Sequence, residues 1–241
     1  ALLLAIKALK LKKGSEAIVP VNTWISTAEA VVEVGLKLIF CDVDLNDYSM
    51  DLKDLKKKIT KKTKLIIPVH LYGNPTNMLE IKKIINKKNI KIVEDCAQAH
   101  GSTIKKKHVG TFGDIGTYSF FPGKNLGSFG DGGAIITNNK KYYEFVLRAR
   151  NHGALKKYDH KFSGQNSRLD TIQAAVLRIK LRNYKKVLTK RNILAEIYYK
   201  NLKNIKSIKL FSLKKNYKSC YHQFVIRTNN RNNLQSFLKN K

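Results

Sequence analysis

The stretch that decides the fold class runs Ile90-Lys91-Ile92-Val93-Glu94-Asp95, a short apolar segment that ends on two carboxylates. Similar short apolar runs precede it along the chain, at residues 17–20, 37–42 and 65–69. Helical patterns separate these runs, one from Ser26 to Val34 with Gly35 in the usual stop position and one capped by Asn77 that reaches about Asn86. Continuously apolar strands that alternate with helices predict an α/β fold, with a mostly parallel sheet flanked by helices. Ligands of such sheets bind beyond the carboxyl ends of the strands.

The sequence pattern changes after residue 168. A long helical stretch, predicted from Leu169 to about Asn201, leads into two strand-like segments and a final helix, at residues 207–210, 222–226 and from about Asn230. We therefore expect a large domain over residues 1–165, followed over residues 166–241 by the long helix and part of a small α+β domain. The chain starts without a methionine, within a helical pattern, so we expect a fragment that is truncated at both ends.

A formal net charge of +30 at pH 7 has two interpretations. A nucleic-acid-binding protein gathers basic residues on one face. Here the 47 basic residues are mostly lysine, are spread along the chain and often stand beside Asn and Ile, as in residues 82–89. This dispersal favours a general compositional bias, and nucleic acid is not expected as a partner.

Cysteine use and hydropathy bear on the location of the protein. The three cysteines, at positions 41, 96 and 220, show no metal-binding or redox spacing, which predicts reduced thiols in a cytoplasmic protein. Cys41 and Cys96 stand in apolar strand-like contexts, where core positions are expected. No apolar run is long enough to cross a bilayer, and no two histidines stand at ligand spacing, so neither a membrane nor a metal is expected.

The lysine distribution itself indicates a functional site. Residues 109–139 hold a single lysine, Lys124, and eight of the 14 glycines, in a chain where lysine is otherwise abundant. Taken alone, this window is equally well explained as a tightly packed glycine-rich loop. A Schiff-base enzyme, in contrast, requires an amine within reach of a cofactor carbonyl and donors for the cofactor phosphate. The carboxylate of Asp95 is costly to bury without a cation or donor, and a protonated pyridine nitrogen is one such partner.

Six motifs carry a resemblance to a known family. In chain order they are Val19-Pro20-Val21-Asn22-Thr23-Trp24, residues 40–44, residues 68–73, residues 94–101, Ser119-Phe120-Phe121-Pro122-Gly123-Lys124-Asn125-Leu126-Gly127 and residues 164–170. With these motifs the chain closely resembles the aminotransferase family named for the regulator DegT and sugar enzymes such as DnrJ and StrS. The resemblance implies the fold of fold-type-I aminotransferases, the cofactor pyridoxal 5'-phosphate, and a homodimer with a shared active site.

The same resemblance implies a role for each matching residue. Lys124 is expected to bind the cofactor covalently and then to move protons between cofactor and substrate. Asp95 would pair with the pyridine nitrogen, and Gln98 would lie near the ring hydroxyl. The other implied cofactor contacts are Trp24 on the ring face, Ser119 on the phosphate and Asn166 on the cofactor phosphate of a partner subunit.

Simpler interpretations of these positions stay open at this point. Trp24, the only tryptophan, could be a core residue, whereas Gln98 and Ser119 could be ordinary polar groups of a helix and a loop. Asn166 could mark only the start of a helix. Three histidines in family motifs are expected to make structural hydrogen bonds rather than to act in catalysis: His70, His100 and His152.

The implied reaction is the transamination of a sugar. An amino donor, expected to be glutamate, would give its amino group to the cofactor, which would pass it to a keto group of a nucleotide-linked sugar. The segments 121–127 and 166–170 look most like members that act on 3-keto rather than 4-keto sugars. In the loop between Gly153 and Gly164, Tyr158 and His160 are candidates for contacting the sugar, although a solvated loop explains them equally well. The pathway that the family suggests is polysaccharide biosynthesis.

Two alternatives remain: a regulatory or nucleic-acid-binding protein, and a relative that binds the cofactor without transaminase turnover. Some relatives are dehydratases with histidine in place of the lysine, and Lys124 argues against that branch. The family's Gly-Thr or Ser-Gly-Thr turn, whose backbone amides bind the cofactor phosphate, would precede Ala1 and is not in the sequence. Weaker cofactor binding is therefore expected of this fragment alone.

Overall fold

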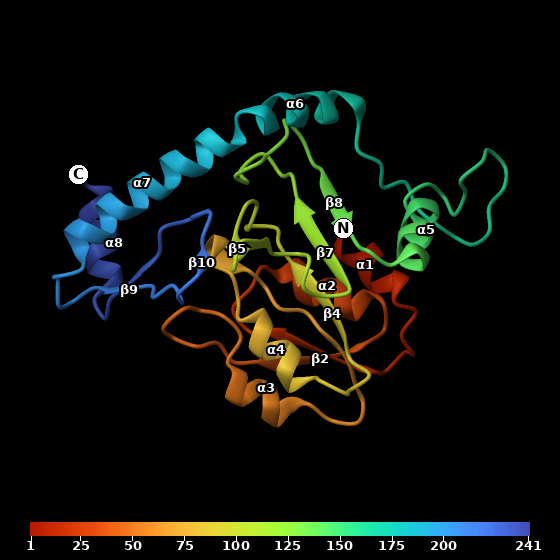
Figure 1. Ribbon diagram of the computed structural model, residues 1–241, viewed down its shortest axis with the longest axis horizontal. Helices are drawn as coiled ribbons and strands as arrows, with labels where there is room; N and C mark the ends of the chain where they lie inside the picture. The colour runs from red at the N-terminus through yellow and green to blue at the C-terminus, as the bar shows by residue number, and fades with distance from the viewer.

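A six-stranded sheet forms the centre of the computed structural model, which describes residues 1–241 (Figure 1). The strand order is β2-β1-β3-β4-β7-β8. All hydrogen-bonded neighbours are parallel except β7 and β8, which are antiparallel. The strands are β1 (Glu16–Pro20), β2 (Lys37–Cys41), β3 (Thr63–Ile66), β4 (Lys91–Asp95), β7 (Ile115–Ser119) and β8 (Gly133–Ile136). The predicted α/β fold with a mostly parallel sheet is confirmed.

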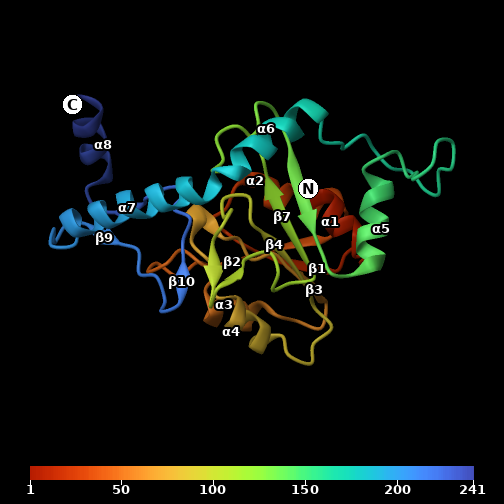
Figure 2. The ribbon, with the colours of Figure 1, turned by 45° about the horizontal axis from the view of Figure 1, so that its top comes forward.

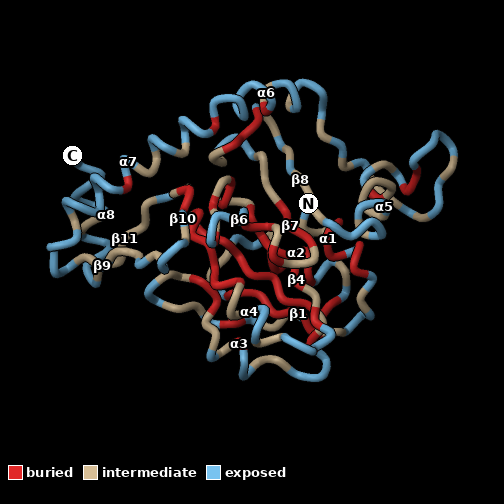
Figure 3. The backbone as a smooth tube through the Cα atoms, viewed as in Figure 1, coloured by how far each residue is buried: buried red, intermediate tan, exposed pale blue.

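Helices cover both faces of this sheet (Figure 2). Alternate side chains of a strand point to opposite faces, so Ala17 and Val19 of β1 enter one core and Ile18 enters the other. The first core is completed by α1 (Leu2–Ala8), α2 (Ile25–Glu33) and α5 (Lys140–Ala149), and the second by α3 (Leu52–Lys58) and α4 (Met78–Ile84). The buried part of the chain accordingly follows the strands (Figure 3).

Two helices, α6 (Thr171–Arg182) and α7 (Tyr184–Leu202), occupy the stretch predicted as one long helix. Asn183 separates them, with φ −100° and ψ 1°. The two helices pass along one side of the sheet and then away from it, and they are mostly exposed (Figures 1 and 3). Leu177 and Tyr184 pack with Leu126, so the junction of the two helices lies against the loop that contains Lys124.

The C-terminal region contains short strands. β9 pairs with β11 in an antiparallel ribbon, and β10 joins β5, which also pairs with β6. These elements and the last helix are β5 (Thr103–Ile104), β6 (Lys107–His108), β9 (Lys209–Leu210), β10 (Tyr217–Lys218), β11 (Ile226–Arg227) and α8 (Arg231–Lys239). Through β10, the C-terminal region is attached to the segment that follows Asp95 in the sequence.

Three local predictions from the sequence agree with the structure to different degrees. Gly35 has a φ of 77°, as the predicted helix stop requires. Asn77 stands at the N-cap position of α4, but its side chain makes no capping hydrogen bond and instead accepts one of 3.0 Å from the Tyr217 hydroxyl. The window 109–139, interpreted as a glycine-rich segment, contains β7 and β8, two strands that its glycines concealed.

All three cysteines are free thiols in buried positions. The core positions predicted for Cys41 and Cys96 are thereby confirmed, and Cys220 is buried as well. None of the helices combines the length and the apolar character that crossing a membrane requires.

Candidate active site

Asp95 is the last residue of β4, at the carboxyl end of a strand inside the sheet. Its N–H donates to the carbonyl of Pro68 (2.9 Å), and its own carbonyl accepts from the N–H of His70 (3.0 Å). The buried carboxylate accepts two hydrogen bonds, one at Oδ1 from the Ala97 N–H (3.0 Å) and one at Oδ2 from the Thr27 hydroxyl (2.9 Å). Asp95 is therefore held at both its main chain and its side chain.

Lys124 lies in the loop between β7 and β8, and its side chain is half-buried. Burial lowers the pKa of the Lys124 amine, while the negative charge of Asp95 acts in the opposite direction. The structure thus brings together the two residues that the sequence placed at the centre of the site. A lysine amine with a lowered pKa has a larger neutral fraction, and the neutral amine is the form that attacks a carbonyl carbon.

Several hydrogen bonds hold the loop that contains Lys124. The Lys124 N–H donates to the carbonyl of Phe121 (2.9 Å) within the loop. From α6, Oε1 of Gln173 accepts from the N–H groups of Phe129 (2.8 Å) and Gly130 (3.0 Å). The loop is consequently stabilised by a hydrogen bond within its own backbone and by hydrogen bonds to α6.

Gln98 lies in the turn that follows β4. Its Oε1 accepts a 2.6 Å hydrogen bond from the N–H of Tyr72, which is in the 3-10 turn η1 (Leu71–Gly73). Tyr72 has a φ of 59°, which is uncommon for a residue with a Cβ, and the Gln98 contact helps to hold it there. The amide nitrogen of Gln98 remains available as a donor, because its oxygen alone is engaged by the protein.

Ser119 and Trp24 reach this region from two different elements. Ser119 ends β7, and its Oγ accepts a 3.3 Å hydrogen bond from the N–H of Phe121, so its hydroxyl proton is available to an acceptor. Trp24 directly precedes α2, the helix whose first turn contacts Asp95 through Thr27. Trp24 is 72% exposed, so the alternative that it is a core residue is wrong.

The loop between Gly153 and Gly164 projects past α5, away from the sheet (Figure 2). It is attached to α5 by the stacked rings of Phe145 and Phe162, whose centroids are 4.8 Å apart. Tyr158 is 82% exposed, and the exposed His160 has Nδ1 2.7 Å from the carbonyl oxygen of His152. Within one chain, neither Tyr158 nor His160 is brought to Lys124.

Asn166 is also exposed and lies beyond this loop. Its backbone forms an isolated bridge with Asn151, and its Oδ1 accepts a 3.0 Å hydrogen bond from Nε of Arg168. Helix α6 begins at Thr171, so Asn166 does not mark the helix start. Asn166 makes no hydrogen bond with Asp95 or Lys124 of its own chain.

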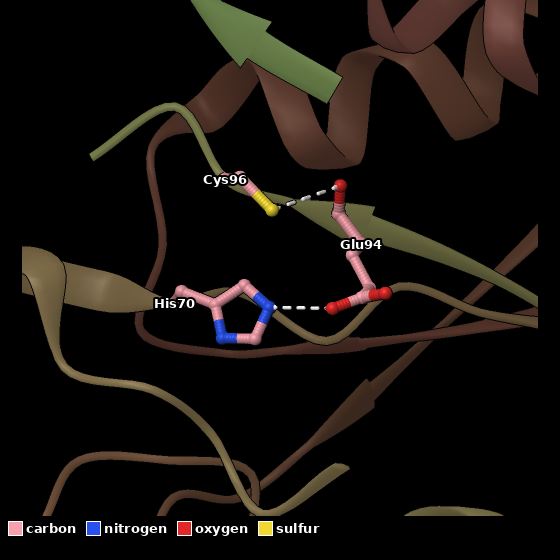
Figure 4. A group of neighbouring side chains, drawn as sticks. All are labelled: His70, Glu94 and Cys96. Carbon is pink, nitrogen blue, oxygen red and sulfur yellow. Dashed lines mark hydrogen bonds and ion pairs between the residues drawn. The ribbon is translucent and has the colours of Figure 1, made fainter. Parts of the chain in front are cut away.

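His70, Glu94 and Cys96 form a buried group whose ligand atoms lie within 4.8 Å of one another (Figure 4). Because strand side chains alternate, Glu94 points to the face of β4 opposite Asp95. Its carboxylate accepts from His70 Nε2 (3.0 Å) and from three backbone N–H groups, those of Gly110 (2.7 Å), Phe112 (2.6 Å) and Gly113 (2.6 Å). Burial alone would raise the pKa of Glu94, but these hydrogen bonds hold it below its usual value.

The atoms of this group are already engaged within the protein. His70 Nδ1 accepts a 3.1 Å hydrogen bond from the Thr76 N–H, so the ring proton is on Nε2, where it is donated to Glu94. Burial raises the pKa of the Cys96 thiol well above its usual value, which disfavours the thiolate that binds metals. We interpret the group as a structural hydrogen-bond network on one face of β4. The structural role predicted for His70 is confirmed.

His100 and His152 do not make the side-chain hydrogen bonds that were expected. His100 is 4% exposed, and neither ring nitrogen has a hydrogen-bond partner of good geometry. Burial lowers the pKa of His100 to about 4, with His222 and Lys124 acting in the same direction. The His152 ring donates and accepts no hydrogen bond; only the main chain of His152 is engaged.

Two residues at this site carried no local signal in the sequence, Thr27 and His222. His222 comes from the C-terminal region, and its Nδ1 lies 3.1 Å from Oδ1 of Asn125, which follows Lys124. Burial, reinforced by the positive charges of Lys124 and Arg191, lowers the pKa of His222 to about 4. Only contacts across the fold identify these two residues, since neither stands near Asp95 or Lys124 in the sequence.

The sheet, the covering helices, and the Lys124 amine within the electrostatic influence of Asp95 define an α/β protein of the aminotransferase kind. The profile of the DegT/DnrJ/EryC1/StrS aminotransferase family matches residues 1–241, and the chain belongs to this family.

Two solved structures and one protein of known activity are similar to it. UDP-N-acetyl-3-dehydro-alpha-D-glucosamine 3-aminotransferase of Acidithiobacillus ferrooxidans is 42% identical over 238 residues, which cover 99% of this chain and 64% of the relative. S. venezuelae DesV, solved in complex with a ketimine intermediate, has a TM-score of 0.95 at 37% identity, over 99% of this chain and 64% of that chain. E. coli GDP-4-keto-6-deoxy-D-mannose-3-dehydratase, solved with bound hydrated PLP, has a TM-score of 0.91 at 29% identity. The match covers 99% of this chain and 68% of that chain. This chain therefore spans about 64% of the length of the first two proteins.

Proposed function

We propose that this protein is a pyridoxal 5'-phosphate-dependent aminotransferase that transfers an amino group, from glutamate, to the 3-keto group of a nucleotide-linked sugar. The observation that carries the proposal is the half-buried Lys124 amine with a lowered pKa, near the fixed and buried carboxylate of Asp95. The name of the Acidithiobacillus relative supports the 3-keto position over the 4-keto position. A cytoplasmic location and a role in polysaccharide biosynthesis belong to the same proposal.

The donors and acceptors of the site fit this cofactor. Asp95 offers a buried carboxylate to a protonated pyridine nitrogen, and the unengaged amide nitrogen of Gln98 suits the ring hydroxyl. The Ser119 hydroxyl can donate to a phosphate oxygen, and the exposed Trp24 ring can cover an aromatic face. When bound, the cofactor supplies a carbonyl carbon for the lysine amine and a ring that withdraws electrons from the reacting carbon.

Lys124 is the group that moves protons in this proposal. Its amine is half-buried with a lowered pKa, so it gives up its proton more readily than an exposed lysine does. The neighbouring His100 and His222 have pKa values of about 4 and are neutral at pH 7, so they place no further positive charge beside it. Asp95 meanwhile supplies a fixed negative charge, which favours a protonated ring nitrogen.

A homodimer with a shared active site is part of the proposal. Large apolar side chains around the site are exposed in the single chain, among them Trp24 (72%), Phe129 (75%) and Ile172 (73%). Large apolar side chains exposed to this extent favour coverage by another protein surface. The exposed Asn166 and the loop with Tyr158 and His160, which do not reach their own Lys124, would then face the site of the partner.

A mixing experiment tests this arrangement. Lys124→Ala and Asn166→Ala chains, each inactive alone, would regain activity when mixed, because a hybrid dimer contains one site with both residues intact. A lack of complementation in mixtures that sedimentation shows to contain hybrid dimers would contradict a shared site.

The basic residues do not favour the nucleic-acid-binding alternative. They occur on α3 and α4 on one side of the sheet and on α6 and α7 on the other side (Figure 1). A compositional bias accounts for this dispersal better than a binding face does.

The first experiment is the visible absorption spectrum of the protein titrated with pyridoxal phosphate, beside Lys124→Ala. We expect the parent to acquire the absorption band of the cofactor bound to a lysine amine, and glutamate to bleach it. The Lys124→Ala variant should not acquire the band, whereas Lys140→Ala, whose side chain is 88% exposed on α5, should behave as the parent. A band that survives the loss of Lys124 would overturn the proposal, and a band that no amino donor bleaches would favour a cofactor-binding relative without turnover. Nucleotide-linked 3-keto and 4-keto sugars, compared as acceptors, then test the keto position.

A further inference from the structure

Two threonine hydroxyls form a chain of hydrogen bonds that ends on Asp95. Thr27 is fully buried in the first turn of α2, and its Oγ1 lies 2.9 Å from Oδ2 of Asp95, although 68 positions separate the residues. The Oγ1 of Thr23, a half-buried residue before the helix, lies 2.9 Å from Oγ1 of Thr27. The three side chains therefore form one connected line from the end of β1 to the end of β4.

The direction of these hydrogen bonds follows from the chemistry of the groups. An ionised carboxylate can only accept hydrogen bonds, so the Thr27 hydroxyl must donate its single proton to Asp95. Thr27 can then only accept from Thr23, which makes Thr23 the donor of the first bond. Hydrogen bonds that point in the same direction along a chain strengthen one another, so Thr23 supports the bond that Thr27 makes.

Thr27 supplies the only side-chain donor to the Asp95 carboxylate. The other hydrogen bond, at Oδ1, comes from the main chain of Ala97, in the same turn as Asp95. With a single donor the carboxylate could still rotate about its own bond, whereas donors on both oxygens fix its plane. The second donor comes from a different element of the fold, so the orientation of Asp95 depends on how α2 packs against β4.

We propose that Thr27 is a positioning residue, which fixes the plane in which the Asp95 carboxylate meets a protonated pyridine nitrogen, and that Thr23 orients the Thr27 hydroxyl. This inference rests on the function proposed above. A purely structural role, in which Thr27 only joins α2 to β4, predicts different behaviour, because it would affect stability and leave the properties of a bound cofactor unchanged.

Two substitutions at Thr27 distinguish the effect of losing the hydroxyl from the effect of changed packing. Thr27→Val has a similar shape but no donor, and Thr27→Ser keeps the donor and loses a methyl group. The measurements are the dissociation constant of pyridoxal phosphate from its visible band, the pH at which that band titrates, and the melting temperature without cofactor. We expect Thr27→Val to weaken binding by about 10- to 100-fold, as the loss of a hydrogen bond to a charged group implies, and to shift the titration of the band. Thr27→Ser should stay within about threefold of the parent on the same grounds.

Thr23→Val extends the test to a half-buried position, where a substitution disturbs packing less than at the fully buried Thr27. It should weaken pyridoxal phosphate binding by about threefold and shift the band in the same direction as Thr27→Val does. The effect is smaller because this variant loses the hydrogen bond from Thr23 to Thr27 but keeps the bond from Thr27 to Asp95. If Thr27→Val does not fold, an unchanged band and affinity in Thr23→Val overturn the proposal.

Other results would also decide against it. A Thr27→Val variant that binds pyridoxal phosphate as the parent does, with the same titration, removes the positioning role. Equal losses in Thr27→Val and Thr27→Ser would assign the effect to the methyl group and to packing. A parent protein that forms no band would overturn the proposed function itself and this inference with it, whereas a normal parent with an unaffected Thr27→Val variant overturns the inference alone.

Discussion

The His222 Nδ1 lies 3.1 Å from the Oδ1 of Asn125, although 97 positions separate the two residues in the sequence. Asn125 follows Lys124, and its Nδ2 also donates to the carbonyl of Cys220 at 3.1 Å. The C-terminal region therefore touches the lysine loop at two points. A displacement of residues 219–222 should therefore also displace the loop that contains Lys124.

Acidification should destabilise the protein between about pH 6.5 and pH 4. Burial lowers the pKa of both His222 and His100 from 6.5 to about 4, so in this window the unfolded chain takes up protons that the folded chain does not. Stability then falls as the pH falls, by up to about 1.4 kcal/mol per pH unit for the buried His100 and by less for His222, which is only half-buried. Melting temperatures of the parent and of His222→Gln at several pH values would show a shallower slope in the variant. His108→Gln, at an exposed histidine of β6, should keep the slope of the parent, and an equal slope in all three proteins would contradict the prediction.

Gly73→Ala should displace the segment that carries His222. Gly73 has a φ of 89°, and a Cβ there would lie 2.7 Å from Sγ of Cys220 and 2.9 Å from the nitrogen of His222. We expect a loss of about 2–4 kcal/mol, from backbone strain and from this close approach together. Gly14→Ala is a matched control, since Gly14 has a φ of 76° but nothing lies within 4 Å of its Cβ position, so that variant carries the strain alone. Similar unfolding free energies for both variants in urea would show that the contact with Cys220 and His222 is unimportant.

Glu94→Gln should be strongly destabilising. The Glu94 carboxylate is fully buried and accepts from His70 and three backbone N–H groups, and an amide would direct its own donors at some of them. Breaking a buried charged network of this kind costs about 3–5 kcal/mol. Because the folded pKa of Glu94 is lowered, its contribution is present above pH 4.5 and is lost as the pH falls further, so Glu94→Gln should also show weaker acid dependence there. Chemical denaturation at pH 7 measures the loss, and Glu80→Gln, at an exposed glutamate paired with Lys83, should lose nothing measurable.

Gln173→Ala should loosen the lysine loop without unfolding the sheet. Its Oε1 accepts from the N–H groups of Phe129 and Gly130, so both amides would lose their partner. We expect a loss of about 1–2 kcal/mol and faster hydrogen exchange at those two amides. Gln235→Ala, at an exposed position of α8, is the control and should leave the exchange rates unchanged. Unaltered protection of Phe129 and Gly130 in Gln173→Ala would show that the loop is held by its own backbone.

The sheet was predictable from the sequence because its central strands are buried on both faces and are therefore continuously apolar. Strands β7 and β8 were missed, since glycines interrupt the apolar pattern in a region where the chain packs closely against itself. At Gly116, for example, an added Cβ would lie 2.7 Å from the Cα of Gly110. Asn183 gives no clear break signal within a helical pattern, so two helices were predicted as one. The division of the chain at residue 165 stays a prediction.

Within the site, Asp95 and Lys124 were predictable because each stands in an unusual local context, at a strand end and in a window poor in lysine. Gln98, Ser119 and Trp24 were predicted through the family motifs, and their roles stay predictions. Thr27 and His222 had no such context, because their importance arises from packing between segments that lie far apart in the sequence.

The antiparallel return of β8 along β7 has a consequence for how this family can diversify. Ser119 is paired with Gly133, so both ends of the lysine loop are anchored at adjacent points of one hairpin. A parallel successor strand would instead have required a crossover, and a change in its length would have moved the next strand. Here an insertion or deletion beyond Lys124 changes the loop and its contacts with α6, but it need not shift the register of β8 on β7. The hairpin thus separates the length of the loop that contains Lys124 from the register of the strands beneath it.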